Sequence, residues 1–297
     1  MAFGDLLVDG FDGDDFSPSG GLYYKDGLEQ SAGRIAFQKD VSLDGRGALR
    51  LSVTPLESAP DLLRPSDRAE VWERPELRVP YRMGIWYGFA VMFAKPVPQD
   101  DHRYLIAQWK REIDHGHPLD FSPFLAIRLS RGKLFATVET NYHRPPDPVR
   151  YIAGTPPREL VPVKLRPETN QMRALVAKPA GWTDSDARSF RARTDRIKVI
   201  ERGNPMPDPA EGWIDFVVYS KPGPDGSGHI EIFANGKWIV TVLGQIGHND
   251  DGLGENQYFK FGPYRASGPA CEWTLYFDDF RRSPRCSEVL RGADCPF

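Results

Sequence analysis

The sequence predicts an all-β protein, built as a sandwich of two antiparallel sheets that carries a long insertion rich in proline and arginine. Three observations lead to this fold class. Short segments with alternating apolar and polar residues recur along most of the chain, glycine (28) and proline (27) are plentiful, and turn residues separate the segments. All-β sandwiches often exceed about 200 residues as one unit, so we expect a single domain over residues 1–297.

The first six expected strands lie before residue 143. In chain order they are LLVDGF (6–11), GALRLSV (47–53), IWYGFAVMF (85–93), YLIAQW (104–109), FLAIRL (124–129) and KLFATVE (133–139). The clusters DGRG (44–47) and SRGK (130–133) are typical of turns between such strands.

Five more strands are expected after residue 212. They are WIDFVVYS (213–220), HIEIFAN (229–235), WIVTVL (238–243), YFKFGPY (258–264) and WTLYFDDF (273–280). DGSG (225–228) and the pair Asn235–Gly236 indicate hairpin turns. Two packed antiparallel sheets allow all these strands to bury one face each, and a concave outer face would suit a long polymer.

Residues 144–212 interrupt the strand pattern. The segment contains the breakers PPDP (145–148), TPPREL (155–160) and GNPMPDP (203–209). A short helix is expected over residues 184–199, with Thr183 or Ser185 as its N-cap. A loop this long is uncommon in a compact domain unless it is functional, so we interpret the segment as an insertion that walls a binding cleft.

Charge is unevenly distributed along the chain. The whole sequence carries a net charge of −3, whereas residues 144–204 contain thirteen Lys/Arg and seven Asp/Glu. This excess predicts a local basic surface. It could attract nucleic acid, anionic lipid or an acidic glycan, or simply be solvated, and the charge count does not distinguish these.

The three cysteines, Cys271, Cys286 and Cys295, lie near the end of the chain. Cys286 and Cys295 could close a short tail loop in an oxidising compartment, and three free thiols in the cytoplasm fit as well. No apolar run approaches the roughly 18 residues of a membrane span. We expect a periplasmic or secreted protein whose signal peptide has been removed, with a cytoplasmic protein as the alternative.

Three segments together resemble the glucuronan lyase family and its jelly-roll relatives, the alginate lyases and heparin lyase I: RAEVWER (68–74), LIAQWK (105–110) and YFKFGPY (258–264). Arg68 and Glu70 match an Arg-x-Glu strand, Gln108 matches a Gln-x-His strand, and Lys260 and Tyr264 match a tyrosine-rich strand. The resemblance covers most of the chain outside the insertion. It implies a concanavalin-like β-jelly roll that cleaves an acidic, uronate-containing polysaccharide by β-elimination.

The chemistry explains these residue types. Removing the C5 proton of a uronate needs donors and positive charge on the sugar carboxylate, a role that the resemblance gives to Arg68 and Gln108. Tyr264 would act as base and acid where proton and leaving group lie on one face, as in β-D-glucuronate and β-D-mannuronate. An unperturbed tyrosine has a pKa of about 10, so a neighbouring cation, Lys260 or Arg68, would help to form the phenolate.

The sequence departs from the related lyases at Lys110, which occupies the position that is often histidine. A separate imidazole base is missing there, which favours same-face elimination by Tyr264 and a glucuronan-like substrate. His115 and His143 are alternative bases. The other interpretation is that each is an ordinary histidine of a loop or the surface. The substrate-binding candidates are Glu70, Lys110, Tyr258 and Arg265.

Each motif also has a structural interpretation. Arg68 could pair with Glu70 or Glu73 on a strand face, and Gln108 could be an ordinary polar residue of a strand. The aromatic residues Tyr258, Phe259 and Phe261 could belong to the core.

Four aspartates suggest a structural calcium site. Related sandwiches often bind calcium where the first and last strands meet, and here Asp9 and Asp12 belong to the first strand and Asp278 and Asp279 to the last. Turn and cap aspartates are the alternative. The chemistry itself requires no cofactor.

Two other functions compete with a lyase. The first is a laminarinase-type glycoside hydrolase, because EIDHGH (112–117) begins like a Glu-x-Asp-x-x-Glu strand; His117 replaces the last carboxylate, however, so one of the two required acids is absent. The second is a non-catalytic, lectin-like domain, which Lys110 would suit. For the lyase we expect an acidic polysaccharide as substrate, no nucleic acid or membrane as partner, and a monomer.

Overall fold

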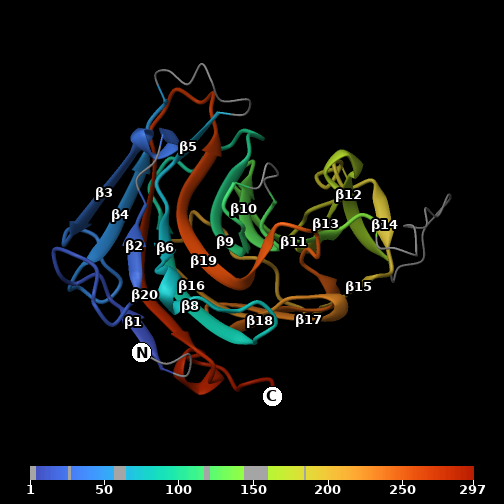
Figure 1. Ribbon diagram of the computed structural model, residues 1–297. Helices are drawn as coiled ribbons and strands as arrows, with labels where there is room; N and C mark the ends of the chain where they lie inside the picture. Colours follow the sequence, from blue (N-terminus) through green and yellow to red (C-terminus); the bar gives the residue numbers. More distant parts are fainter. Residues whose placement is uncertain (1–4, 26–27, 57–64, 117–120, 144–159, 184) are drawn as a thin grey trace.

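The computed structural model describes residues 5–25, 28–56, 65–116, 121–143, 160–183 and 185–297. These residues form two antiparallel sheets that pack face to face (Figure 1), together with four short 3₁₀ helices: η1 (Leu28–Ala32), η2 (Pro75–Leu77), η3 (Pro167–Thr169) and η4 (Cys286–Glu288). The predicted all-β sandwich is confirmed.

One sheet has nine strands. Its order is β15 (Ile197–Glu201), β18 (Lys237–Ile246), β17 (Gly223–Ala234), β16 (Ile214–Lys221), β8 (Ile85–Phe93), β20 (Trp273–Ser283), β4 (Ala48–Val53) and β3 (Gly33–Gln38), and β1 (Leu7–Asp9) pairs with β20. The pairing of β1 with β20 places the start of the described chain beside its last strand.

The other sheet has eleven strands and carries the residues of the family resemblance. Its order is β14 (Ala192–Thr194), β12 (Val161–Arg166), β13 (Gln171–Ala177), β11 (Lys133–Asn141), β10 (Leu125–Ser130), β9 (Tyr104–Ile113), β19 (Leu253–Ala266), β6 (Val71–Glu73) and β2 (Leu22–Tyr24). Two short strands, β5 (Ser66–Arg68) and β7 (Val79–Pro80), also pair with β19.

Aromatic side chains fill the space between the sheets. The Phe259 ring lies 4.7 Å from that of Trp109, and the Phe261 ring lies 4.7 Å from that of Phe277 on the opposite sheet. Neighbouring residues of a strand point to opposite faces. The polar residue between the two phenylalanines, Lys260, therefore faces away from this core, as the alternating pattern of YFKFGPY predicts.

One ion pair joins the two sheets inside the core. Arg282 of β20 donates from Nη1 to Oε1 of Glu73 on β6 (2.6 Å) and to the Leu77 carbonyl (2.7 Å). The second oxygen of Glu73 accepts the backbone N–H of Phe259 (2.6 Å). Both side chains are buried, and a buried charge is tolerated only when it is paired and hydrogen-bonded.

The segment 144–212 differs from the expectation. The helix over residues 184–199 is wrong, because strands β14 and β15 lie there, and β12 and β13 precede them. Their inward apolar residues are buried: Val161, Val163, Met172, Ala174 and Ile197. The prolines concealed this alternation. Residues 144–159 and 184 lie outside the described residues, and the single domain and the cleft wall stay predictions.

The end of the chain is closed by a disulfide between Cys286 and Cys295, and Cys271 is free and exposed. Of the two alternatives that the sequence leaves open, the structure has the tail loop closed by this disulfide. Within the described ranges, no helix is long and apolar enough to span a membrane.

We predict that Arg282→Met destabilises the protein strongly, because it leaves the Glu73 carboxylate buried without its cation. A loss of about 3–5 kcal/mol in the free energy of unfolding is expected, measured by urea denaturation. Arg50→Met is the control, since Arg50 and Glu272 form an exposed pair that should contribute little. Equal effects of the two substitutions would contradict the structural role of the buried pair.

Candidate active site

The register of the eleven-stranded sheet brings the predicted tyrosine and arginine together. Tyr264 of β19 lies opposite Arg68 of β5 on one side and Leu105 of β9 on the other, and Leu105 lies opposite Arg128 of β10. These four residues form one row across four strands. A second row contains Trp72, Lys260, Gln108, Ala126 and Thr137.

Positive charge surrounds the half-buried Tyr264. The guanidinium carbon of Arg68 lies 4.0 Å from the centre of the tyrosine ring, and that of Arg103 lies 4.9 Å from it. Arg128 follows in the same row. Sequence reasoning missed Arg103 and Arg128, although Arg128 does occupy a polar position in the alternating segment FLAIRL. Cations in this arrangement would stabilise negative charge on or near the phenol oxygen.

The other matched residues converge on a carboxylate of the protein itself. Glu70 is buried; its Oε1 accepts from Nε2 of Gln108 (2.5 Å), and its Oε2 accepts from Nζ of Lys260 (2.9 Å). Nη1 of Arg68 lies 3.8 Å from the same Oε2. The expected pairing of Arg68 with Glu70 is therefore present, and Glu70 orients the two side chains expected to act on a sugar carboxylate.

Lys260 does not lie where a cation beside Tyr264 was expected. Its side chain is 1% exposed and its Nζ lies between Glu70 and the Trp72 ring, 4.4 Å from the ring centre. The pKa of Lys260 is lowered to about 8, chiefly by burial and also by the charges of Arg68 and Lys110, while Glu70 opposes them. Lys260 is thus placed to hold Glu70, and the cations over the tyrosine ring are arginines.

Aromatic rings continue the site beyond Lys260. Tyr258 stacks on Trp72 with ring centres 5.4 Å apart, and the guanidinium of Arg78 lies 4.5 Å from the Tyr258 ring centre. These groups line a hollow of about 530 Å³. Its lining also includes the predicted residues Arg68, Lys110, Lys260 and His115. Tyr264 lies in the row beside this hollow rather than among its lining residues.

The remaining predicted residues have different surroundings. Arg265 is fully buried, donates from Nε to Asp67 (2.7 Å) and from Nη1 to the Cys271 carbonyl (2.7 Å), and so cannot contact a substrate. Its prediction as a substrate-binding residue is wrong, because Arg265 follows Tyr264 directly and points to the opposite face of the strand. His115 and His143 are exposed, and the His143 ring packs against Tyr142 at 4.2 Å.

A buried histidine was missed by the sequence analysis. His248 is 1% exposed, and its Nε2 lies 3.2 Å from the carbonyl oxygen of Ser122. Burial lowers the pKa of His248, against the opposing effect of Glu139. No local pattern marks this residue, since it follows strand β18 in a loop and its contacts with Tyr81 and Ser122 come from segments distant in sequence.

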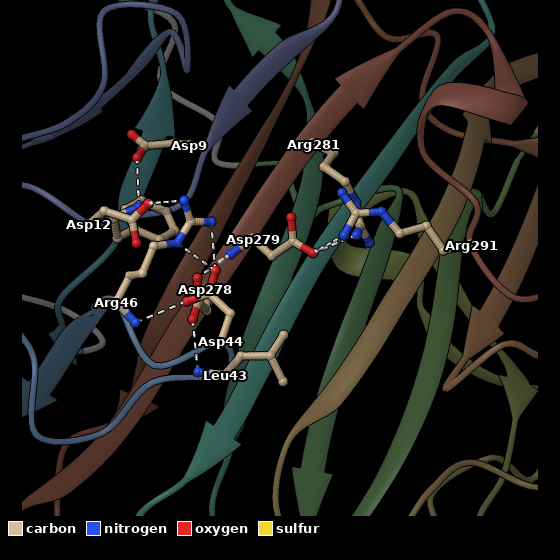
Figure 2. A network of polar contacts seen from close by, with 10 residues as sticks. Asp9, Asp12, Leu43, Asp44, Arg46, Asp278, Asp279, Arg281 and Arg291 are labelled. Carbon is tan, nitrogen blue, oxygen red and sulfur yellow. Dashed lines mark hydrogen bonds and ion pairs between the residues drawn. The ribbon is translucent and has the colours of Figure 1, made fainter.

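The aspartates of the calcium prediction do not converge on one point (Figure 2). The oxygens of Asp9 accept the N–H groups of Phe11 and Ser17, and those of Asp278 accept the N–H groups of Leu43 and Asp279.

Arg46 fills the space nearby, 2.6 Å from Asp44 and 3.6 Å from Asp12. Burial raises the pKa of Asp278 to about 6. The described part of the chain contains no group of three or more acidic, His or Cys residues that could hold a metal ion. The donor set does not fit calcium, and the calcium site stays a prediction without structural support.

The sequence and the fold were compared with known proteins. The family model described as "Polysaccharide lyase" matches residues 15–281. Comparison with curated protein sequences gives no match.

Solved structures are similar to this chain at low sequence identity. An endo-β-1,4-glucuronan lyase from the fungus Trichoderma reesei has a TM-score of 0.58 and 15% identity over 96% of this chain and 97% of that chain. The cellulose-induced protein Cip1 has a TM-score of 0.45 and 13% identity over 94% and 97%. Alginate lyase A1-II′, of polysaccharide lyase family 7, has a TM-score of 0.43 and 13% identity over 83% and 82%. The predicted β-jelly roll is confirmed.

We predict that Lys260→Met removes a pH dependence of stability. Between about pH 8 and pH 10.5 the folded state holds Lys260 largely neutral while the unfolded chain still binds the proton. The stability contribution of this residue therefore rises with pH across that window. Urea denaturation at a series of pH values should show this rise in wild type and a flatter profile in the variant.

Lys237→Met is the control, because Lys237 is exposed and its removal should leave the alkaline profile unchanged. Loss of the cation beside Glu70 lowers the stability of the variant at every pH of this window, so the comparison uses the slope of the profile and not its height. A variant whose alkaline profile matches wild type would contradict the buried state of Lys260.

Proposed function

The chain belongs to the polysaccharide lyase family, and from this premise we propose that it cleaves a uronate-containing polysaccharide by β-elimination with Tyr264 as both base and acid. The observation that carries the proposal is the row of Arg68, Tyr264 and Arg128 on the outer face of the eleven-stranded sheet, with Arg103 over the same tyrosine ring. A phenol surrounded by guanidinium groups suits proton abstraction next to a carboxylate.

In the proposed reaction, the Tyr264 phenolate takes the C5 proton of the uronate. The electron pair of the C5–H bond forms the C4=C5 double bond, and the C4–O4 bond breaks. The phenol that has just formed returns its proton to O4 of the leaving chain. Negative charge develops on the sugar carboxylate in the transition state, and arginine forks are suited to stabilise it.

Gln108 and Glu70 complete this arrangement. A glutamine amide carries two N–H groups, and one of those of Gln108 is already held by Glu70. We assign the second N–H to the sugar carboxylate. Glu70 is then a positioning residue, because it fixes the amide of Gln108 and the ammonium of Lys260 without contacting the substrate.

The proposed substrate is glucuronan-like. Lys110 stands where related lyases often have histidine, so a single tyrosine on one face of the sugar is favoured, which fits β-D-glucuronate and β-D-mannuronate. The similarity to the fold of a glucuronan lyase supports the same choice. The Cys286–Cys295 disulfide supports a periplasmic or secreted location.

The hydrolase alternative loses support from the surroundings of its candidate acid. Glu112 accepts from Nη1 of Arg78 (2.9 Å) and from Nδ2 of Asn256 (2.9 Å), so it is engaged in a charge pair. Asp114 is exposed, and His117 lies outside the described residues. Glycoside hydrolysis needs two carboxyl groups that act together on one glycosidic bond. In this segment Glu112 is held by Arg78, and the pattern offers no further carboxylate at position 117 to act with Asp114.

We predict that Tyr264→Phe abolishes turnover and leaves polymer binding largely intact, since only the phenol oxygen is removed. The assay follows the ultraviolet absorbance of the unsaturated product on glucuronan, polymannuronate, polyguluronate and heparin-type chains. General acid–base catalysis by one group contributes about 10²–10⁴-fold, so a loss of at least that size is expected.

Tyr276→Phe on the nine-stranded sheet is the matched control and should keep wild-type activity. Near-normal turnover by Tyr264→Phe would refute the assignment of the base. If wild type released reducing ends without unsaturated products, the chain would act as a hydrolase, and binding without any cleavage would indicate a lectin-like protein.

A further inference from the structure

A cluster of four basic side chains lies on the same sheet as Tyr264, and three of the four are not used in the proposed chemistry. The basic cluster consists of Arg128 on β10, Lys164 and Arg166 on β12, and Arg173 on β13. The three arginines share one carboxylate. Glu139 of β11 lies 2.5 Å from Nε of Arg173, 3.3 Å from Nη2 of Arg128 and 3.8 Å from Nη1 of Arg166.

The cluster therefore carries an excess of positive charge. Within the described parts of the chain, Lys164 has no carboxylate at ion-pair distance, and it lies opposite Arg173 in the strand pairing. Lys164 is exposed, and partial desolvation and the charges of Arg173, Arg166 and Arg128 lower its pKa. Because these cations outnumber the carboxylate between them, positive charge remains that an anion could neutralise.

Donors for this anion are present at the cluster. Arg166 donates to Oε1 of Gln171 (3.1 Å), while Nε2 of the same glutamine is buried and has no hydrogen-bond partner among the described residues. A glutamine amide beside a guanidinium offers several N–H groups to one carboxylate. The same pair of residue types, Arg68 and Gln108, occurs near Tyr264.

The cluster is separated from Tyr264 by a defined number of strands. The order β19–β9–β10–β11–β13–β12 places Arg173 four strands and Lys164 five strands from Tyr264. At about 4.8 Å per strand this is about 19–24 Å along the sheet. In Figure 1, β12 lies beside β14, the strand that ends this curved sheet, and β19 lies toward the other end. Such a span corresponds to several sugar units of an extended polymer.

We propose that the basic cluster is a second uronate-binding subsite, which holds a carboxylate of the polymer several sugars away from the bond cleaved at Tyr264. The inference rests on the proposed function and narrows it. The substrate is a long chain with acid groups on successive sugars, and cleavage is internal rather than terminal. It also gives a role to the basic part of segment 144–204, because three of the four cations belong to it.

The test compares kcat/KM on defined oligouronates of increasing length for wild type, Lys164→Gln and Arg173→Gln. Wild type should improve with length until the oligomer spans both sites. Each variant should lose about tenfold on the polymer, as expected for one charge-assisted contact, with weaker dependence on salt. On oligomers too short to reach the cluster, both variants should match wild type.

Lys198→Gln is the matched control, an exposed lysine of the same basic segment that lies on the nine-stranded sheet. Arg173→Gln removes a contact with the buried Glu139 and could therefore disturb the fold. Lys164→Gln leaves the contacts of Glu139 intact, so it tests the subsite even if Arg173→Gln does not fold. Variants equal to wild type at every length, or equally impaired on short oligomers, would overturn the subsite.

If wild type cleaves no polyuronate, the proposed function fails, and the cluster is still tested by retardation in gels that contain polyuronate. Weaker retardation of Lys164→Gln than of wild type and Lys198→Gln would support the subsite. Unchanged retardation, or an effect seen only in gels that contain DNA, would overturn it.

Discussion

A carboxylate that is taken out of water must be met by cations or N–H groups, and two such carboxylates hold this structure together around β19. Glu73 faces the core, where it accepts from Arg282 of the opposite sheet and from the backbone of Phe259. Glu70 faces the outer side, where it accepts from Lys260 and Gln108. Strand β19 is therefore fixed from both faces, only a few residues before Tyr264. Displacing it would leave two buried charges unpaired.

The same rule separates structural arginines from those available to a ligand. Arg282 and Arg265 each have a carboxylate of their own inside the protein, Glu73 and Asp67. The three arginines of the basic cluster share Glu139 alone. An arginine that pairs with its own carboxylate is neutralised within the fold, whereas several arginines that share one carboxylate leave positive charge for an anion. The ratio of arginines to the carboxylates that they contact therefore indicates a binding site better than the number of basic residues does.

Most strands and part of the site could be predicted from the sequence, because both depend on local patterns. Alternation in YFKFGPY correctly assigns Phe259 and Phe261 to the core and Lys260 to the outer face. Pairing partners are not local. Arg103 and Arg128 reach the tyrosine through strand pairing and packing between segments distant in sequence. Prolines likewise concealed strands β12–β15, whose apolar residues become recognisable once the sheets that they extend are known.

The positions of Glu70 and Glu139 suggest how one sheet can separate chemistry from binding. Near Tyr264, Glu70 neutralises part of the local positive charge and holds Gln108 and Lys260 in place, which favours a site of defined geometry. At β11–β13 a single carboxylate is outnumbered by its cations, which favours attraction over geometry. An acidic polymer bound at the basic cluster would extend along the sheet to Tyr264. The residues that set the cleavage rate at Tyr264 would then differ from those that set the affinity for the polymer.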